Sequence, residues 1–166
     1  MTQVTKNNST KFLGKERLEK RGDIHIKHDV YIASPFFKPD QIERVQLVED
    51  TLDRLGITYF SPRKVLVCPP DATEEQRKKT FKGNHDGILQ SRAVIAITDG
   101  KDVGTIWEMG VAYQAGVPVI GVALTLGDKP FNLMLSESCY STCRTIEELE
   151  KTLTDGSEIY YEGKIE

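Results

Sequence analysis

The sequence has only three cysteines among its 166 residues, and their arrangement argues against two classes of protein. An odd number is not the pattern of a small domain held together by disulfide bonds. The cysteines also show no zinc-like spacing with the three histidines. We therefore expect reduced thiols, as is usual in the cytoplasm, and no bound metal.

Long apolar runs, an excess of one charge and phosphate-binding signatures are also missing. No run approaches the roughly 20 apolar residues that span a membrane, and the first residues lack the apolar core of a secretory signal. The net charge of -3 gives no sign of a nucleic-acid or membrane surface. Neither a Walker A motif nor G-x-G-x-x-G occurs. We expect a cytoplasmic protein that binds neither membranes nor nucleic-acid polymers.

What the chain does contain is ordinary for a globular protein, with 39% hydrophobic and 28% charged residues. Its length fits one domain with a sizeable core. Residues 1–27 are polar and of mixed charge, which indicates a solvated N-terminal extension. We expect a single α/β domain over residues 28–155 and a C-terminal tail over residues 156–166.

From residue 28 onward, short apolar runs alternate with segments of helical periodicity. The predicted strands are 30–33, 57–60, 93–97 and 117–124, and the predicted helices are 40–55, 74–90, 105–115 and 145–153. Strands separated by helices of this length pair in parallel through right-handed crossovers. The sequence therefore predicts a doubly wound, flavodoxin- or Rossmann-like parallel sheet of four to five strands flanked by helices. Ligands of such sheets bind at the carboxyl ends of the strands.

Residues 98–110 place one carboxylate at that edge of the sheet. They join the predicted strand 93–97 to a helix that Gly116 ends, and Glu108 lies in the first turns of this helix. At helical spacing Glu108 shares a face with small apolar residues, where a charge is costly unless it has a use. The positive end of the helix dipole favours its ionised form. Two interpretations stay open: a sheltered nucleophile or base, and a helix-start glutamate that points to solvent.

Two neighbouring features could complete a cleft. Phe36 and Phe37 follow the first strand, where they either stack on a planar ring or pack onto the core. Asp99 and Asp102 lie just before Glu108, so three carboxylates fall within ten residues. Paired carboxylates divide the roles of nucleophile and acid in glycosidic bond cleavage.

These residues resemble the nucleoside 2-deoxyribosyltransferase family. The matching segments are VYIASPFF at 30–37, FSPR at 60–63, FKGNHDGI at 81–88, DVGTIWEMG at 102–110, GVPV at 116–119 and NLM at 132–134. The resemblance covers about residues 28–140, and its most specific part is Asp-x-Gly-Thr-x-Trp-Glu-x-Gly.

The resemblance implies an activity without a cofactor. In this family a glutamate attacks the anomeric carbon of a 2'-deoxyribonucleoside, expels the base and holds the sugar covalently until a second base takes it. Glu108 matches that nucleophile, Asp102 matches the aspartate that handles the proton of the base, and Tyr31 matches the tyrosine that orients the glutamate. The expected partners are a deoxynucleoside and a free nucleobase.

The resemblance also implies a substrate-binding set and a homo-oligomer. In this set Phe36 and Phe37 lie near the base, and Ser61 and Arg63 shape the cleft wall. The set further contains Asn84, Asp99 and Gly104. Asn132 and Met134 match residues that a neighbouring subunit contributes to a shared active site.

Asn84 departs from the family pattern. Several members have an aspartate there that binds the 5'-hydroxyl of the sugar, and asparagine can still form such a hydrogen bond. We expect a nucleoside rather than a nucleoside 5'-monophosphate, because no phosphate pocket follows the first strand.

Alternative functions remain open at this point. The same Glu108 intermediate would serve an N-glycosidase that hydrolyses a nucleoside or its 5'-monophosphate. A non-catalytic nucleotide-binding domain and an interaction protein that uses the N-terminal extension are the other candidates.

Overall fold

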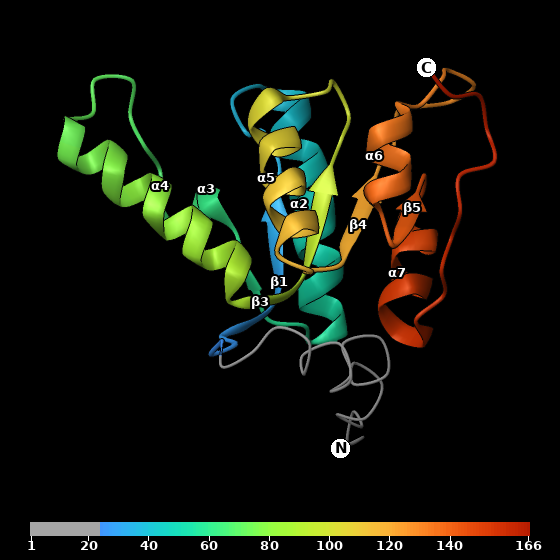
Figure 1. The fold of residues 1–166 in the computed structure, drawn as a ribbon, viewed down its shortest axis with the longest axis horizontal. Coiled ribbons are helices and arrows are strands. Elements are labelled where there is room, and N and C mark those ends of the chain that lie inside the picture. The colour runs from blue at the N-terminus through green and yellow to red at the C-terminus, as the bar shows by residue number, and fades with distance from the viewer. Residues whose placement is uncertain (1–23) are drawn as a thin grey trace.

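The computed structural model describes residues 24–166, which form one parallel sheet with helices on both faces (Figure 1). The predicted N-terminal extension, residues 1–27, lies outside the described residues except for its last four. The elements are β1 (His28–Ala33), α2 (Pro39–Leu55), β2 (Tyr59–Phe60), α3 (Pro62–Val65), α4 (Glu74–Leu89), β3 (Ser91–Ile97), α5 (Val103–Gln114), β4 (Val119–Val122), α6 (Leu133–Ser138), β5 (Ser141–Cys143) and α7 (Ile146–Asp155).

The strand order is β2-β1-β3-β4-β5, and every neighbouring pair is parallel. The predicted doubly wound α/β fold is therefore confirmed, with five strands. After β1 the chain continues to β2, at one edge of the sheet, and after β3 it continues to β4 and β5, toward the opposite edge. The point between β1 and β3 is where ligands of such folds bind.

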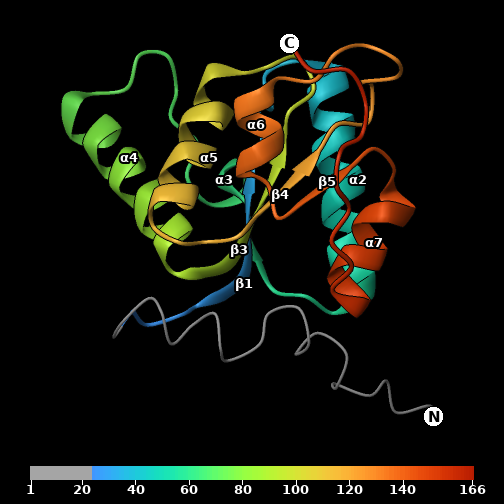
Figure 2. The ribbon, with the colours of Figure 1, turned by 45° about the vertical axis from the view of Figure 1, so that its right-hand side comes forward.

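Two apolar clusters hold the helices to the two faces of the sheet. Helices α2 and α7 cover one face, and α4, α5 and α6 cover the other (Figure 2). Alternate residues of β1 enter different clusters, with Val30 and Ile32 on the α2 side and Tyr31 and Ala33 on the α4 and α5 side. This alternation is the period-2 pattern of a strand buried on both faces. It aims the Tyr31 side chain toward α5.

Helix α4 lies very close to the ring of Tyr31. A side-chain carbon at Gly87 would be 3.2 Å from two ring atoms of Tyr31 and 3.3 Å from the ring of Phe60. Those two rings stack, with centroids 5.5 Å apart. Gly87 therefore allows the helix to pack against the strand where the tyrosine is held.

The helix ends follow ordinary capping rules, with one difference from expectation. Gly116, with φ of 71°, follows the C-cap of α5 as predicted. Asp40, expected at the start of α2, lies inside its first turn and pairs with Arg44, because Pro39 already begins the helix. Residues 61–73, for which no helix or strand is predicted, contain the short α3, and α6 and β5 were not predicted either.

None of the helices between residues 24 and 166 combines the length and the apolar character that a membrane crossing requires.

Candidate active site

A cleft of about 760 Å³ opens at the carboxyl ends of β1 and β3. Its walls come from the loop after β1, from the segment joining α3 to α4, from one face of α4 and from the start of α5. Its volume is in the range of pockets that hold small organic ligands. The predicted cleft residues Phe36, Phe37, Asn84, Asp102 and Gly104 line it together with Glu108.

Glu108 is held at the floor of this cleft by a tyrosine of the sheet. The Tyr31 hydroxyl donates a hydrogen bond of 2.5 Å to Glu108 Oε1. Tyr31 is completely buried, so its ring cannot swing away from this position. A short hydrogen bond from a fixed phenol leaves the second carboxylate oxygen of Glu108 available to a ligand. Of the two interpretations of Glu108, the structure favours the sheltered carboxylate.

The electrostatics of Glu108 suit a group that reacts near neutral pH. Burial raises the pKa of Glu108 to about 7, the hydrogen bond from Tyr31 opposes this rise, and the negative charge of Asp102 adds to it. Burial and the adjacent Glu108 charge also raise the pKa of Tyr31, so the phenol remains a hydrogen-bond donor. A perturbed carboxyl in a cleft is a common mark of a functional site.

Asp102 combines a structural task with a place in the cleft. It is the N-cap of α5, and its Oδ2 accepts hydrogen bonds from the Thr105 N–H at 2.9 Å and the Thr105 hydroxyl at 3.1 Å. A side-chain cap of this kind fixes the carboxylate relative to the helix. Since Glu108 lies on the second turn of the same helix, this cap helps to hold the two carboxylates near each other.

Phe36 and Phe37 differ in environment, so that one packs onto the core and the other can stack on a planar ring. Both line the cleft, with ring centroids 5.0 Å apart. Phe36 packs partly against the core on the α2 side, whereas Phe37 is 75% exposed. One ring is therefore anchored, and the other is available to a planar ligand.

Asn84 lines the cleft and has one side-chain atom whose hydrogen-bonding capacity is unused. Its Oδ1 is buried and has no hydrogen-bond partner within the part of the chain that the structure describes. A buried polar atom without a partner is costly, and such atoms mark places where a ligand or water completes the site. Thr80, one turn earlier on α4, lines the same wall.

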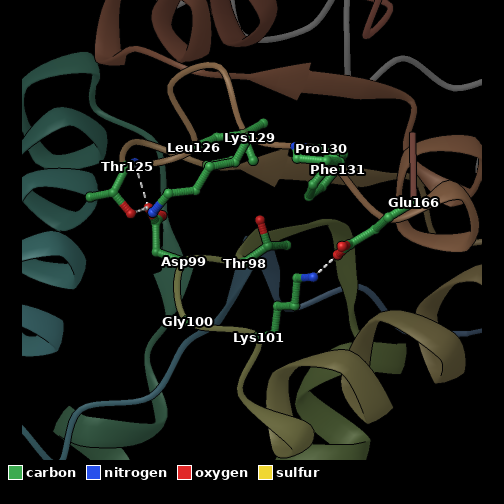
Figure 3. Close-up of a pocket in the computed structure, with 11 residues that line it drawn as sticks. Thr98, Asp99, Gly100, Lys101, Thr125, Leu126, Lys129, Pro130, Phe131 and Glu166 are labelled. Carbon is green, nitrogen blue, oxygen red and sulfur yellow. Dashed lines mark hydrogen bonds and ion pairs between the residues drawn. The ribbon is translucent and has the colours of Figure 1, made fainter. Parts of the chain in front are cut away.

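Three predicted substrate-binding residues have their polar groups engaged away from the cleft lining. The Ser61 hydroxyl donates to Glu49 Oε1 at 2.7 Å, and the Arg63 guanidinium pairs with the same buried carboxylate. Asp99 faces a second cavity (Figure 3) and accepts hydrogen bonds from the backbone N–H groups of Leu124 and Thr125. These side chains support the loops around the site.

Asn132 and Met134 lie at the start of α6 and do not line the cleft of their own chain. Asn132 caps this helix through hydrogen bonds from the N–H groups of Met134 and Leu135. The Met134 side chain is 74% exposed.

The segment after α3 supplies lining residues that were not predicted. They are Leu66, Val67, Cys68, Pro69 and Pro70. No periodic signal identifies a proline-containing loop as a cleft wall. Thr80 could have been found, because it is four residues before Asn84 and so shares its helix face.

Within residues 24–166, no group of three or more histidine, cysteine, aspartate or glutamate side chains is arranged to hold a metal ion.

Comparisons with known proteins give one family match and two similar solved structures. The family model described as nucleoside 2-deoxyribosyltransferase matches residues 30–134. A solved 2-deoxyribosyltransferase from Bacillus psychrosaccharolyticus is 29% identical, with a TM-score of 0.70 over 80% of this chain and 98% of the other. A conserved protein from Enterococcus faecalis V583 is 18% identical, with a TM-score of 0.49 over 82% and 89% of the two chains. The search of curated proteins finds no match.

The matched segment contains Tyr31, Asn84, Asp102 and Glu108, and its last residue is Met134. It covers well over half of the chain. The chain therefore belongs to the nucleoside 2-deoxyribosyltransferase family.

Proposed function

We propose that this protein exchanges the base of a 2'-deoxyribonucleoside through a covalent deoxyribosyl intermediate on Glu108. The observation that carries the proposal is the partly buried Glu108 carboxylate, held by the Tyr31 hydroxyl at 2.5 Å at a cleft large enough for a nucleoside. Membership of the family supports the reaction type.

In the first step a carboxylate oxygen of Glu108 forms a bond to C1' while the bond from C1' to the base nitrogen breaks. The electron pair of that bond leaves with the base, and Asp102 controls the proton that the base gains. The second base attacks C1' from the vacated position, the bond from C1' to Glu108 breaks to release the carboxylate, and the proton of the second base returns to Asp102. A 2'-deoxy sugar reaches an oxocarbenium-like transition state easily, and the adjacent carboxylate stabilises its positive charge.

The remaining cleft residues fit a nucleoside. Phe37, which is exposed beside the anchored Phe36, offers a face on which a base can stack. The free Oδ1 of Asn84 accepts a hydrogen bond from a sugar hydroxyl. The charged residues that line the cleft, Asp102 and Glu108, are both acidic, which favours a neutral nucleoside over its 5'-monophosphate.

A homo-oligomer with shared active sites is part of the proposal. Large apolar side chains are exposed at the starts of α5 and α6, including Val103, Trp107 and Met134. Exposed apolar side chains of this size are available to an interface between copies of the chain. Asn132 and Met134, which do not line the cleft of their own chain, would then serve the site of a second copy.

The decisive experiment uses the purified chain, one deoxynucleoside and a different free base. Chromatography should reveal a new deoxynucleoside that carries the added base. Free deoxyribose without the new nucleoside would replace this proposal with the N-glycosidase. The absence of both products would favour a non-catalytic nucleotide-binding domain.

The pH dependence of exchange should report the ionisation of Glu108. Only the carboxylate attacks C1', and burial raises the pKa of Glu108 to about 7, so kcat/KM should fall as the pH drops through about 7. The hydrogen bond from Tyr31 lowers this pKa. The variant Tyr31→Phe should therefore move the acid limb of the profile to higher pH.

Tyr160→Phe is the matched control, because Tyr160 is exposed and its hydroxyl donates to Glu137. Its pH profile should overlay that of the unmodified protein. An acid limb that stays in place in Tyr31→Phe would contradict the assignment of Glu108 as the titrating group.

A further inference from the structure

The loop that carries Asp102 separates two cavities. Asp102 and Gly104 line the Glu108 cleft, whereas the preceding residues, from Thr98 to Lys101, line a second cavity of about 410 Å³ (Figure 3). The opposite wall of the second cavity comes from the segment after β4 and from Glu166. A movement of this loop on one side therefore changes both cavities.

Lys101 reaches across the second cavity and forms an ion pair with Glu166 (Figure 3). Its backbone has φ of 50°, and among the described residues it is the one non-glycine residue with a positive φ. This region is unfavourable for a residue with a Cβ atom and persists where its surroundings hold it. The Lys101 N–H closes the turn by donating to the Thr98 carbonyl at 3.0 Å. The ion pair then tethers the side chain of the same strained residue.

Glu166 is itself fixed by the backbone that leads into α6. Its N–H donates to the Phe131 carbonyl at 2.9 Å, and its carbonyl accepts from the Leu133 N–H at 3.2 Å. The Phe131 N–H donates to the Lys164 carbonyl at 2.8 Å, so residues 164–166 run parallel to residues 131–133. The buried ring of Tyr161 packs against Phe131 and secures the start of this tail. The backbone that carries the Glu166 carboxylate is thus held in place by residues 131–133.

We propose that Lys101 and Glu166 are positioning residues for the base-exchange reaction, whose ion pair holds the Asp102 carboxylate in its place at the cleft. This inference rests on the proposed function of Asp102.

The physical reason is the position of Asp102 between two anchors. On its C-terminal side, the hydrogen bonds to Thr105 tie it to α5. On its N-terminal side, the only side chain between Asp102 and the Gly100 turn is Lys101. When the ion pair with Glu166 is lost, the turn at Gly100 and Lys101 can relax from its positive φ. The hydrogen bonds between Asp102 and Thr105 are then the remaining anchor of the loop. Because proton transfer requires hydrogen-bond geometry, a displaced Asp102 slows turnover more than it weakens binding.

The test uses Lys101→Met and Glu166→Gln, each of which removes one charge of the pair. Each should reduce kcat about threefold, the size expected for a half-exposed ion pair, with KM little changed. The acid limb of the pH profile should move to lower pH, because the charge of Asp102 helps to raise the pKa of Glu108. Lys101→Arg should retain activity, and the charge-swapped double variant K101E/E166K should recover it.

Lys78→Met is the matched control, since Lys78 pairs with Glu74 on the exposed face of α4. It should leave kcat and the pH profile unchanged.

A second measurement needs no substrate. The Thr105 amide hydrogen is protected from exchange by its bond to Asp102, so its exchange rate should rise in Lys101→Met and in Glu166→Gln but not in Lys78→Met. If exchange of this amide is unaltered and kcat is unaltered, the positioning role is refuted. If the amide exchanges faster but the unmodified protein converts no nucleoside, the loop contact stands and the proposed function fails.

Discussion

Replacement of Glu108 by glutamine is expected to lower base exchange by about four orders of magnitude, the loss typical of a removed nucleophile. Glutamine has nearly the same shape as glutamate, and its side-chain carbonyl can still accept the hydrogen bond from Tyr31. The substitution therefore keeps the packing of the cleft floor and removes only the anion that attacks C1'. The thermal midpoint should change little, because a neutral amide costs less to bury than a carboxylate.

Two measurements check this result. Chromatography of the exchange reaction gives the rate, and mass spectrometry of protein incubated with a deoxynucleoside alone looks for one added deoxyribosyl group. The adduct should form on the unmodified chain and be absent from Glu108→Gln. Glu147→Gln, at an exposed position of α7, is the control and should retain full activity. Retention of a tenth or more of the activity in Glu108→Gln would exclude a covalent role for this residue.

Replacement of Glu49 by alanine is expected to reduce the free energy of unfolding by about 3 kcal/mol, because it breaks a buried ion pair by removing one partner. Glu49 is fully buried on α2 and accepts hydrogen bonds from Ser61 and Arg63. Burial alone would raise the pKa of this carboxyl, but the bonds from Arg63, Ser61 and Lys64 outweigh it and hold the pKa below its usual value. Arg63 and Lys64 can reach water after the substitution, which keeps the loss at the lower end for such pairs.

Chemical unfolding of both proteins by urea measures this difference. Glu43→Ala is the control, because Glu43 is an exposed glutamate on the same helix. If Glu49→Ala and Glu43→Ala unfold at the same urea concentration, Glu49 does not hold the turn that begins α3. A depressed folded-state pKa also means that the contribution of Glu49 is present above pH 4.5 and is lost as the pH falls below it.

The sheet and its main helices could be predicted because their apolar residues follow regular periods. The β-branched run of β3 and the glycine after α5 are examples, since each acts through local chemistry. β5 escaped prediction for the opposite reason. This strand is three residues long, and two of them are polar. It can be buried because residues distant in the sequence form hydrogen bonds with its polar groups. The Ser141 hydroxyl bonds to that of Thr152, and the Thr142 N–H donates to the Ile159 carbonyl. Such partners cannot be recognised from a short window of sequence.

The difference between local signals and distant partners also explains which residues of the candidate site could be predicted. Glu108 and Asp102 belong to one helix start, so their spacing in the sequence becomes a spacing in space. Ser61 and Asp99, which follow strands, belong to the predicted substrate-binding set, but their polar atoms bond to Glu49 and to the loop after β4. Position at the end of a strand indicates proximity to a site, whereas the direction of a side chain depends on partners from other elements.

The contact between Gly87 and Tyr31 determines which part of α4 can be altered without disturbing the tyrosine that holds Glu108. A methyl group at position 87 would press on the phenol that aligns Glu108, so laboratory evolution should leave that end of α4 untouched. Asn84 and Thr80, about one and two turns earlier on the same helix, line the cleft. The C-terminal turn of α4 is thus constrained at Gly87 by the ring of Tyr31, whereas substitutions in the middle of the helix change only the wall of the cleft.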